Sequence, residues 1–397
     1  CSFAVDVAKE SDIITPELKT AGNVLVRFDI TKNEYDLPDF EQVKALYAAV
    51  HELIVKKAVV SAYVCDANGL IPALSKMAFG NMKGFALNND LKEEQLFAPA
   101  YGCIVAEVEK SRLSEITVPY TTVGTVTDEA KFTYKEVAIN AEEALSVWKE
   151  PLENVFPTKV SKDETPVESK IYKADSVYVC KNKVAKPTVF IPVFPGTNCE
   201  YDSTKAFERA GADVVTKVFK NLSGNDIRES VDAFEKAISD AQIIMFPGGF
   251  SAGDEPEGSA KFFATAFRNA KMTEAVGKLL SERDGLALGI CNGFQALIKL
   301  GLVPFGKIVA PSAENPTLTF NEIGRHQSRL VRTRISSNLS PWLSLYEVGE
   351  VVTVPISHGE GRFVCGETRL AALAANGQIA TQYAGLDGYA TMDTAFN

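Results

Sequence analysis

Two short apolar segments in the second half of the chain most restrict the fold that it can adopt. Residues 242–246 and 285–290 predict short strands without alternation of polar and apolar residues, and helical segments lie between the strands of this region. A strand that is apolar on both faces is typical of a parallel sheet covered by helices. Strands that alternate with helices require right-handed crossovers. We therefore expect residues 187–397 to form an α/β domain with a doubly wound, mostly parallel sheet, flavodoxin-like in layout, on which ligands bind at the carboxyl ends of the strands.

The segment 149–186 divides the chain into two parts. It contains three prolines among mixed charges and shows no helical or strand period, which predicts an exposed linker. Before it, residues 1–148 combine strand-like segments such as 23–30 with a helical spacing of apolar residues over 40–57. We therefore expect a smaller α+β domain in front of the linker.

Composition excludes several classes of function. The net charge is −10, from 41 basic and 51 acidic residues, whereas a nucleic-acid-binding protein usually presents a basic face. No apolar run approaches the roughly 18 residues that cross a bilayer. The seven cysteines are odd in number and include no C-x-x-C pair, which favours a reducing, cytoplasmic setting over a disulfide framework or a zinc site. We expect no metal site and no nucleic-acid or membrane partner.

The string Gly289-Ile-Cys-Asn-Gly293 is the strongest indication of chemistry. It is a G-x-C-x-G pattern between an apolar strand and a helix, and a nucleophile at such a strained turn needs small residues two places to either side. The N-terminus of the following helix offers N–H groups and a partial positive charge, which favour a thiolate. We predict that Cys291 is a nucleophile. The alternative is a buried structural cysteine, which is how we interpret the other six.

A thiolate that attacks a carbonyl needs hydrogen-bond donors directed at the developing oxyanion. The string Phe246-Pro-Gly-Gly-Phe250 follows the neighbouring strand and turns at the same edge of the sheet. Glycine lets the backbone approach a ligand closely. We predict that the N–H groups of Gly249 and Asn292 form the oxyanion hole, although the P-G-G-F string alone indicates only a tight turn.

Only three histidines are available as a general base. His358 follows a strand-like segment and has Glu360 two places further on, so the pair could supply the base and its orienting group. The alternative is a polar loop that contributes contacts to substrate or to another domain. We expect His326, among polar and basic residues, to lie at the surface, and His51 to lie within a helix.

Four strings give the second part a specific resemblance. Residues 187–397 resemble the glutaminase domain of class I glutamine amidotransferases and, more narrowly, the C-terminal domain of phosphoribosylformylglycinamidine synthase in its large single-chain form. The strings, in order, are Pro195-Gly-Thr-Asn-Cys-Glu-Tyr-Asp202, Pro247-Gly-Gly-Phe-Ser-Ala-Gly-Asp254, Leu288-Gly-Ile-Cys-Asn-Gly-Phe-Gln295 and Pro355-Ile-Ser-His-Gly-Glu-Gly-Arg-Phe363. Residues 1–148 resemble, more loosely, the C-terminal part of an aminoimidazole-ribonucleotide-synthetase-like unit, with D-A-N-G-L at 66–70 where that family usually has S-D-G-G-L.

The resemblance implies a ligase of purine biosynthesis. The reaction would be the ATP-dependent conversion of formylglycinamide ribonucleotide to formylglycinamidine ribonucleotide, with nitrogen taken from glutamine through a thioester on Cys291. Ammonia would pass to N-terminal synthetase units of the same parent chain. No cofactor is expected in this chain, and ATP and Mg are expected in the complete enzyme. The resemblance further implies a set of substrate-binding residues: Gly248, Phe250, Gln295, His358, Glu360 and Arg362.

The resemblance also implies that this chain is a fragment. It does not begin with methionine, and it lacks the H-P-E segment whose His and Glu complete the family's catalytic triad. We therefore expect a nucleophile without its usual base, and reduced activity. We favour His358 as a pocket residue, because its string matches an upstream loop of the family. Two alternatives are a cysteine hydrolase or peptidase that uses Cys291 with His358, and a scaffold module in which Cys291 is vestigial.

Overall fold

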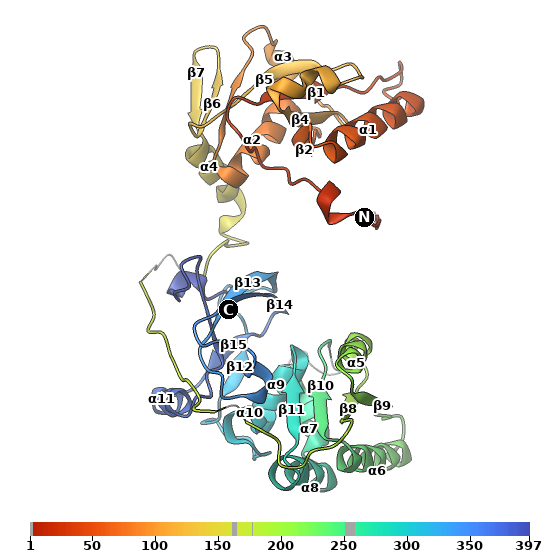
Figure 1. Ribbon diagram of the computed structural model, residues 1–397, viewed down its shortest axis with the longest axis vertical. Coiled ribbons are helices and arrows are strands. Elements are labelled where there is room, and N and C mark those ends of the chain that lie inside the picture. Colours follow the sequence, from red (N-terminus) through yellow and green to blue (C-terminus); the bar gives the residue numbers. More distant parts are fainter. Residues whose placement is uncertain (1–2, 161–164, 177, 251–258) are drawn as a thin grey trace. The chain divides into compact units, whose positions relative to one another are not determined.

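The chain folds into two compact units. The computed structural model describes residues 3–160, 165–176, 178–250 and 259–397. The units are Cys1–Val155 and Phe156–Asn397, and each combines helices and strands around its own hydrophobic core (Figure 1). None of the helices in the described segments combines the length and the apolar character that a bilayer crossing requires.

The first unit is built on one seven-stranded sheet. Its strands are β1 (Val24–Phe28), β2 (Val59–Val64), β3 (Gly84–Leu87), β4 (Ile104–Val108), β5 (Thr121–Thr127), β6 (Lys131–Tyr134) and β7 (Val137–Asn140). Their order in the sheet is β2-β4-β1-β5-β3-β6-β7, and every neighbouring pair is antiparallel except β3 with β6. This sheet makes the first unit an α+β structure.

Helices cover both faces of this sheet. They are α1 (Phe40–Val55), α2 (Leu70–Asn81), α3 (Glu93–Phe97) and α4 (Ala141–Glu153), with 3₁₀ turns at Glu10–Asp12 and Lys110–Glu115. Side chains of β1 alternate between the faces, because successive residues of a strand point to opposite sides. Val26 and Phe28 join the apolar cluster that contains α1 residues, and Leu25 joins the cluster that contains α2 residues.

The second unit begins with the parallel sheet that the apolar segments predict. Its strands are β8 (Thr188–Val193), β9 (Asp213–Val218), β10 (Ile243–Phe246) and β11 (Leu286–Gly289), in the order β11-β10-β8-β9, and all pairs are parallel. Between and after them lie α5 (Glu200–Arg209), α6 (Gly224–Asp240), α7 (Lys261–Phe267), α8 (Ala270–Gly277), a π-helical turn (Lys278–Glu282), α9 (Asn292–Leu300) and α10 (Leu302–Phe305). The predicted strand–helix alternation is confirmed for this part of the chain.

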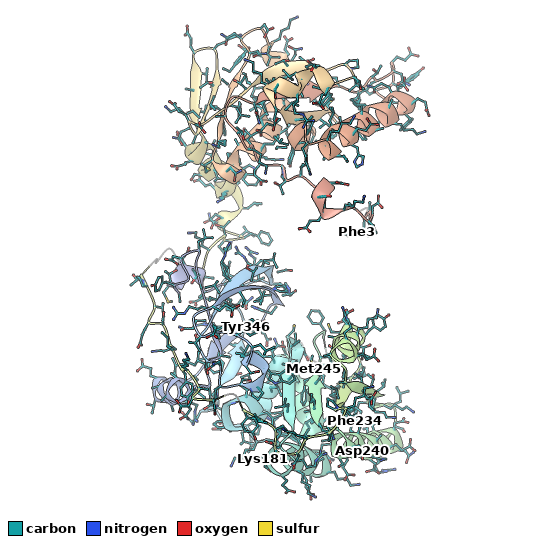
Figure 2. The ribbon with its side chains drawn as sticks, in the orientation of Figure 1. Phe3, Lys181, Phe234, Asp240, Met245 and Tyr346 are labelled. Carbon is teal, nitrogen blue, oxygen red and sulfur yellow. The ribbon has the colours of Figure 1, made fainter. Side chains whose placement is uncertain are left out.

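Both faces of the central strands β8 and β10 are buried. Phe190 and Phe246 join a cluster with Phe234 of α6, whereas Val189 and Met245 belong to a second cluster. Figure 2 labels one residue of each cluster, Phe234 and Met245. Helices α6 and α8 pack against each other (Figure 1). This two-sided burial explains why the strands lack a polar face.

The chain after α10 departs from the parallel pattern. Strands β13 (Gln327–Ile335), β14 (Val351–His358) and β16 (Thr381–Tyr383) form an antiparallel sheet in the order β14-β13-β16, and β12 (Thr317–Thr319) pairs with β15 (Arg362–Val364). A 3₁₀ turn at Pro341–Leu343 lies where the chain reverses between β13 and β14; α11 (Glu367–Ala375) and a 3₁₀ turn at Met392–Thr394 complete the unit. The parallel sheet is therefore followed by antiparallel strands within the same unit.

The predicted linker 149–186 is only partly a linker. Its first residues continue α4 to Glu153. In this helix, the ring centroid of Trp148 lies 5.8 Å from the ring centroid of Phe79 in α2. Much of the rest is bonded to the second unit: the Lys170 N–H donates to Gln382 Oε1 at 2.7 Å, and the Ala174 N–H donates to Asn338 Oδ1 at 2.9 Å. The described part of 156–182 is therefore a strap on the second unit, which its mixed composition did not indicate.

Candidate active site

The site lies where two neighbouring parallel strands end. Strands β10 and β11 pair in register, with Phe246 opposite Gly289, so the strings that follow them leave the sheet side by side. One string begins the predicted oxyanion turn and the other contains Cys291. The last four residues of the string 247–254 lie outside the described residues. The carboxyl edge of the sheet thus brings together the two strings that the sequence singled out.

Cys291 occupies a strained turn. Its φ is 53° and its ψ is −114°, and it is the N-cap of α9. A positive φ is uncommon for a residue with a Cβ and is maintained only where the surrounding structure requires it. The flanking glycines supply that structure, because a Cβ on Gly289 would lie 2.6 Å from the Gly293 carbonyl oxygen, and a Cβ on Gly293 would lie 1.9 Å from the Phe246 carbonyl oxygen. The G-x-C-x-G spacing is therefore a steric requirement of this turn.

The thiol of Cys291 is exposed. Its Sγ donates a hydrogen bond to the Ser357 carbonyl oxygen at 3.5 Å. The nine-residue helix α9 starts at the next residue, so the partial positive charge of its N-terminus lies beside the sulfur. Exposure and this helix end are the conditions under which a cysteine is reactive.

A cavity of about 580 Å³ opens at Cys291. Seven of the nine predicted site residues line it: Gly248, Gly249, Phe250, Cys291, Gln295, His358 and Glu360. Residues from β12, β14 and β16 complete the wall, so the antiparallel part of the unit closes the site that the parallel sheet begins. Asn292 and Arg362 do not line this cavity.

The predicted oxyanion residues differ in their surroundings. Gly249 lines the cavity at a φ of 102°, and a Cβ there would lie 2.5 Å from Asn198 Oδ1, so the position demands glycine. The N–H of the next residue, Phe250, donates to the Gly196 carbonyl oxygen at 3.2 Å. Asn292 is buried, and its Nδ2 donates to Gln295 Oε1 at 3.3 Å. Its backbone N–H belongs to the first residue of α9.

Gln295 and Glu360 join α9 to the loop that follows β14. Both are buried, at 5% and 6% exposure. The Gln295 Nε2 donates to the Glu360 carbonyl oxygen at 2.8 Å, and the Glu360 carboxylate accepts from the Ser259 N–H at 3.1 Å. Unpaired buried polar groups are costly, so these bonds fix the loop against the helix that positions Cys291.

His358 is held by Asn321, a residue that the sequence did not indicate. The ring Nδ1 lies 3.1 Å from Asn321 Oδ1, the Asn321 Nδ2 donates to the His358 carbonyl oxygen at 2.8 Å, and the ring covers Gly361. Burial, and secondarily the charge of His326, lower the pKa of His358 below 6.5. Among the described residues, the hydrogen bond of the Cys291 sulfur goes to Ser357 and not to this ring. This agrees with the interpretation of His358 as a pocket residue.

His326 has a role that the sequence did not predict, and Arg362 lies away from its predicted role. His326 is exposed, as expected for a surface residue, but it also lines the cavity, where its Nε2 lies 2.9 Å from Ser357 Oγ. The pairing of Gln327 in β13 with His358 in β14 brings His326 to the cavity. Pairing between strands that are distant in the chain leaves no local pattern in the sequence. Arg362 lies outside the cavity, where its guanidinium is 3.8 Å from the Glu322 carboxylate, an exposed pair that stabilises little.

The part of the chain that the structure describes offers no group of side chains suited to a metal ion. No group of three or more His, Cys, Asp and Glu side chains there is arranged to hold an ion. The groups that the structure brings together at this site are the thiol, the backbone amides at the strand ends and the polar loop after β14.

Comparison with known proteins identifies the second unit. Residues 186–397, just over half of the chain, match the family model of the CobB/CobQ-like glutamine amidotransferase domain.

Similar solved structures come from Thermotoga maritima. The structure of PurLQS is 30% identical and has a TM-score of 0.34, with 46% of this chain and 71% of that chain covered. PurL complexed with FGAR is 14% identical and has a TM-score of 0.30, with 34% and 29% covered. Phosphoribosylformylglycinamidine synthase II is 11% identical and has a TM-score of 0.30, with 83% and 60% covered. The family match of the second unit shows that the chain belongs to the CobB/CobQ-like glutamine amidotransferases.

Proposed function

We propose that the chain hydrolyses glutamine at Cys291 and is the glutaminase part of an ATP-dependent ligase. The ligase would convert formylglycinamide ribonucleotide to formylglycinamidine ribonucleotide. The observation that carries the proposal is the position of Cys291, an exposed thiol at a φ of 53° in front of α9, inside the cavity. The family match and the four strings support glutamine as the substrate.

The proposed reaction has two stages at one sulfur. Cys291 Sγ forms a bond to the side-chain carbonyl carbon of glutamine, the N–H groups of Gly249 and Asn292 stabilise the oxyanion, and the C–N bond breaks as ammonia leaves with the thiol proton. Water then attacks the glutamyl thioester, the C–S bond breaks, and glutamate leaves as the sulfur regains a proton. The strained turn favours this route because it exposes the sulfur to a substrate in the cavity.

Substrate binding is assigned to the residues that line the cavity. Gly248 lets a substrate approach the backbone, and Phe250 offers an apolar surface that is 71% exposed. Gln295, Glu360 and His358 give the cavity its polar wall, with Gln295 and the Glu360 carboxylate near the amino-acid end of glutamine. Arg362 does not contact the bound substrate, because it lies outside the cavity and pairs with Glu322.

The ligase half of the proposal rests on other parts of the enzyme. We assign ATP and Mg²⁺ to N-terminal synthetase units of a large single parent chain, to which ammonia would pass, in the cytoplasm. The resemblance of residues 1–148 to a synthetase-like unit supports this assignment.

Slow turnover is part of the proposal. The Ser357 carbonyl oxygen accepts the thiol hydrogen bond, but a carbonyl cannot act as a general base at neutral pH. General acid–base catalysis contributes roughly 10²–10⁴-fold. We therefore expect acylation of Cys291 to be observable and steady-state turnover to be low. The alternative hydrolase would need the His358 ring at the sulfur, and that ring is bonded to Asn321.

Rapid-quench measurements with labelled glutamine test the proposal. The wild-type chain is expected to accumulate acid-stable label and to release ammonia, and Cys291→Ala is expected to do neither. Cys365→Ser is the matched control, because this partly buried cysteine does not line the cavity. Asparagine, which is one methylene shorter, serves as the control substrate. Equal ammonia release by wild type and Cys291→Ala would contradict the proposal, as would hydrolysis of peptides or esters in place of glutamine.

A further inference from the structure

A second cysteine lies beside the nucleophile. Cys199 is the N-cap of α5 and lines the same cavity as Cys291. The position that a Cβ of Gly248 would occupy is 3.2 Å from Cys291 Cβ and 3.5 Å from Cys199 Sγ. Because Gly248 has no side chain, the space between the two cysteines stays open.

The surroundings of the two thiols are unequal. Burial raises the pKa of Cys199, and the charges of Cys291, Glu200 and Asp202 raise it further. Cys199 Sγ donates to Asn198 Oδ1 at 3.3 Å, so it stays a half-buried thiol. Cys291 is exposed at the start of α9 and is the thiol that a small oxidant in the cavity meets first. None of the other cysteines that the structure describes lines this cavity.

We propose that Cys199 is a resolving cysteine, which forms a reversible disulfide with Cys291 when a peroxide oxidises the nucleophile. The disulfide stops acylation of Cys291 and prevents its irreversible oxidation. A thiol reductant restores the site. This role concerns the two sulfurs and does not depend on which substrate Cys291 attacks.

The chemistry balances in two steps with hydrogen peroxide as the oxidant. The Cys291 thiolate attacks one peroxide oxygen, an S–O bond forms, the O–O bond breaks and hydroxide leaves as water, which gives a sulfenic acid. The Cys199 sulfur then attacks the Cys291 sulfur, an S–S bond forms, the S–O bond breaks and the second water takes the Cys199 proton. Two thiols and one peroxide give one disulfide and two waters.

Cys291 Cβ and Cys199 Sγ both lie within 3.5 Å of one point, the Cβ position at Gly248, so the two side chains border the same open space. In a disulfide the two Cβ atoms lie about 3.5–4.5 Å apart. The gap at Gly248 is roughly that of a methyl group, and Cys291 has only a 3.5 Å bond to the Ser357 carbonyl oxygen to give up. Rotation of the two side chains toward each other is the movement that the disulfide needs.

Peptide mapping of the full chain without reduction tests the inference. After hydrogen peroxide treatment, a cross-linked pair of peptides that contain Cys199 and Cys291 is expected, two hydrogens lighter than the separate peptides and lost on reduction. Cys199→Ser should give no such pair, and Cys291 should then proceed to the sulfinic acid. Cys365→Ser should keep the cross-link, because it removes a thiol outside the cavity.

A second variant keeps both thiols. Gly248→Ala places a methyl group in the gap, and the cross-link should form at least about tenfold more slowly. This test does not depend on whether the Cys199→Ser variant folds. The inference would be overturned if Cys291 reached the sulfinic acid equally fast in wild type and Cys199→Ser. A disulfide from Cys291 to any cysteine other than Cys199 would also overturn it.

Discussion

At the scale of single residues, the site depends on positions where only one residue type fits. Gly293 is the clearest, because its missing Cβ lets α9 begin against the backbone of β10. Cys291 keeps a positive φ because the closely packed residues around it allow no other backbone conformation. The sequence predicted this turn because its requirement is local and steric.

Gly293→Ala is expected to lower the free energy of unfolding by about 2–3 kcal/mol, the upper range for single substitutions. The added methyl group would meet the Phe246 carbonyl oxygen at 1.9 Å. Gly277→Ala is the control: it lies at the end of α8 with no atom within 4 Å of the new methyl group, and should be neutral or stabilising by up to about 1 kcal/mol. Urea denaturation measures both, and similar losses in the two variants would contradict this account.

The lowered pKa of His358 predicts a pH dependence of stability. Below pH 6.5 the unfolded state gains a proton that the folded state resists, so stability should fall as the pH drops through 6.5. His358→Gln should reduce this slope, measured by urea denaturation from about pH 7.5 to pH 5.5. Trp342 reports on the second unit if Trp148 is replaced by Phe. His51→Gln, in the first unit, is the control, and an unchanged slope in His358→Gln would show that burial of this ring does not matter.

At the scale of elements, the buried Asn321 side chain adds to the bonds that position the loop after β14. Asn321 accepts from the Gly361 N–H at 3.0 Å, and its own backbone N–H donates to the Gly359 carbonyl oxygen at 2.9 Å. The same side chain bonds His358 on both its ring and its carbonyl oxygen. One residue on the chain between β12 and β13 therefore holds the loop that forms part of the cavity wall.

Asn321→Ala is expected to raise the KM for glutamine about tenfold or more, the effect of roughly 1.4 kcal/mol. It should also lower stability by about 1–3 kcal/mol, because buried polar groups lose their partner. Asn315→Ala is the matched control, since it removes one bond to the Ala310 carbonyl oxygen away from the cavity. An unchanged KM in Asn321→Ala, with the chain folded, would show that this loop does not form the glutamine pocket.

The elements divide into those that the sequence could predict and those that it could not. Strand β10 was predictable from consecutive apolar residues, and the turn at Cys291 was predictable from the glycine spacing. Both are local signals. Asn321 follows β12, which pairs with β15, and His326 precedes β13, which pairs with β14. No pattern in a single sequence specifies these registers. The prolines of 149–186, Pro151 among them, predicted a linker that begins at residue 149. The structure instead continues α4 through Pro151 to Glu153, and Trp148 of this helix packs on Phe79.

At the scale of the whole molecule, the strap belongs to the second unit. Besides its bonds near Lys170, the Tyr172 N–H donates to the Ser336 carbonyl oxygen at 2.8 Å, and the Lys181 N–H donates to the Asp284 carboxylate at 2.8 Å. The Lys181 bond, and secondarily a hydrogen bond that Tyr178 donates to the same carboxylate, hold the pKa of Asp284 below its usual range. Segments that look like linkers in composition can thus be part of a folded unit.

A fragment that begins at Phe156 is therefore expected to be more stable than one that begins at Ala185. Each of the several hydrogen bonds made by the strap contributes about 1 kcal/mol, so the free energies of unfolding of the two fragments should differ by roughly 2–4 kcal/mol. Urea denaturation of the two fragments, followed by Trp342 fluorescence, measures it. Equal midpoints would show that the strap contributes nothing to the second unit.

The central claim is that Cys291 is the nucleophile of a glutamine site. A diazoketone analogue of glutamine tests it most directly, because it alkylates a thiolate only after binding as glutamine does. The account predicts one equivalent of label on Cys291 by peptide mapping, slowed by glutamine and not by asparagine, and absent in Cys291→Ser. Labelling of Cys291 that glutamine does not slow, or label that appears equally on exposed Cys180, would contradict the claim.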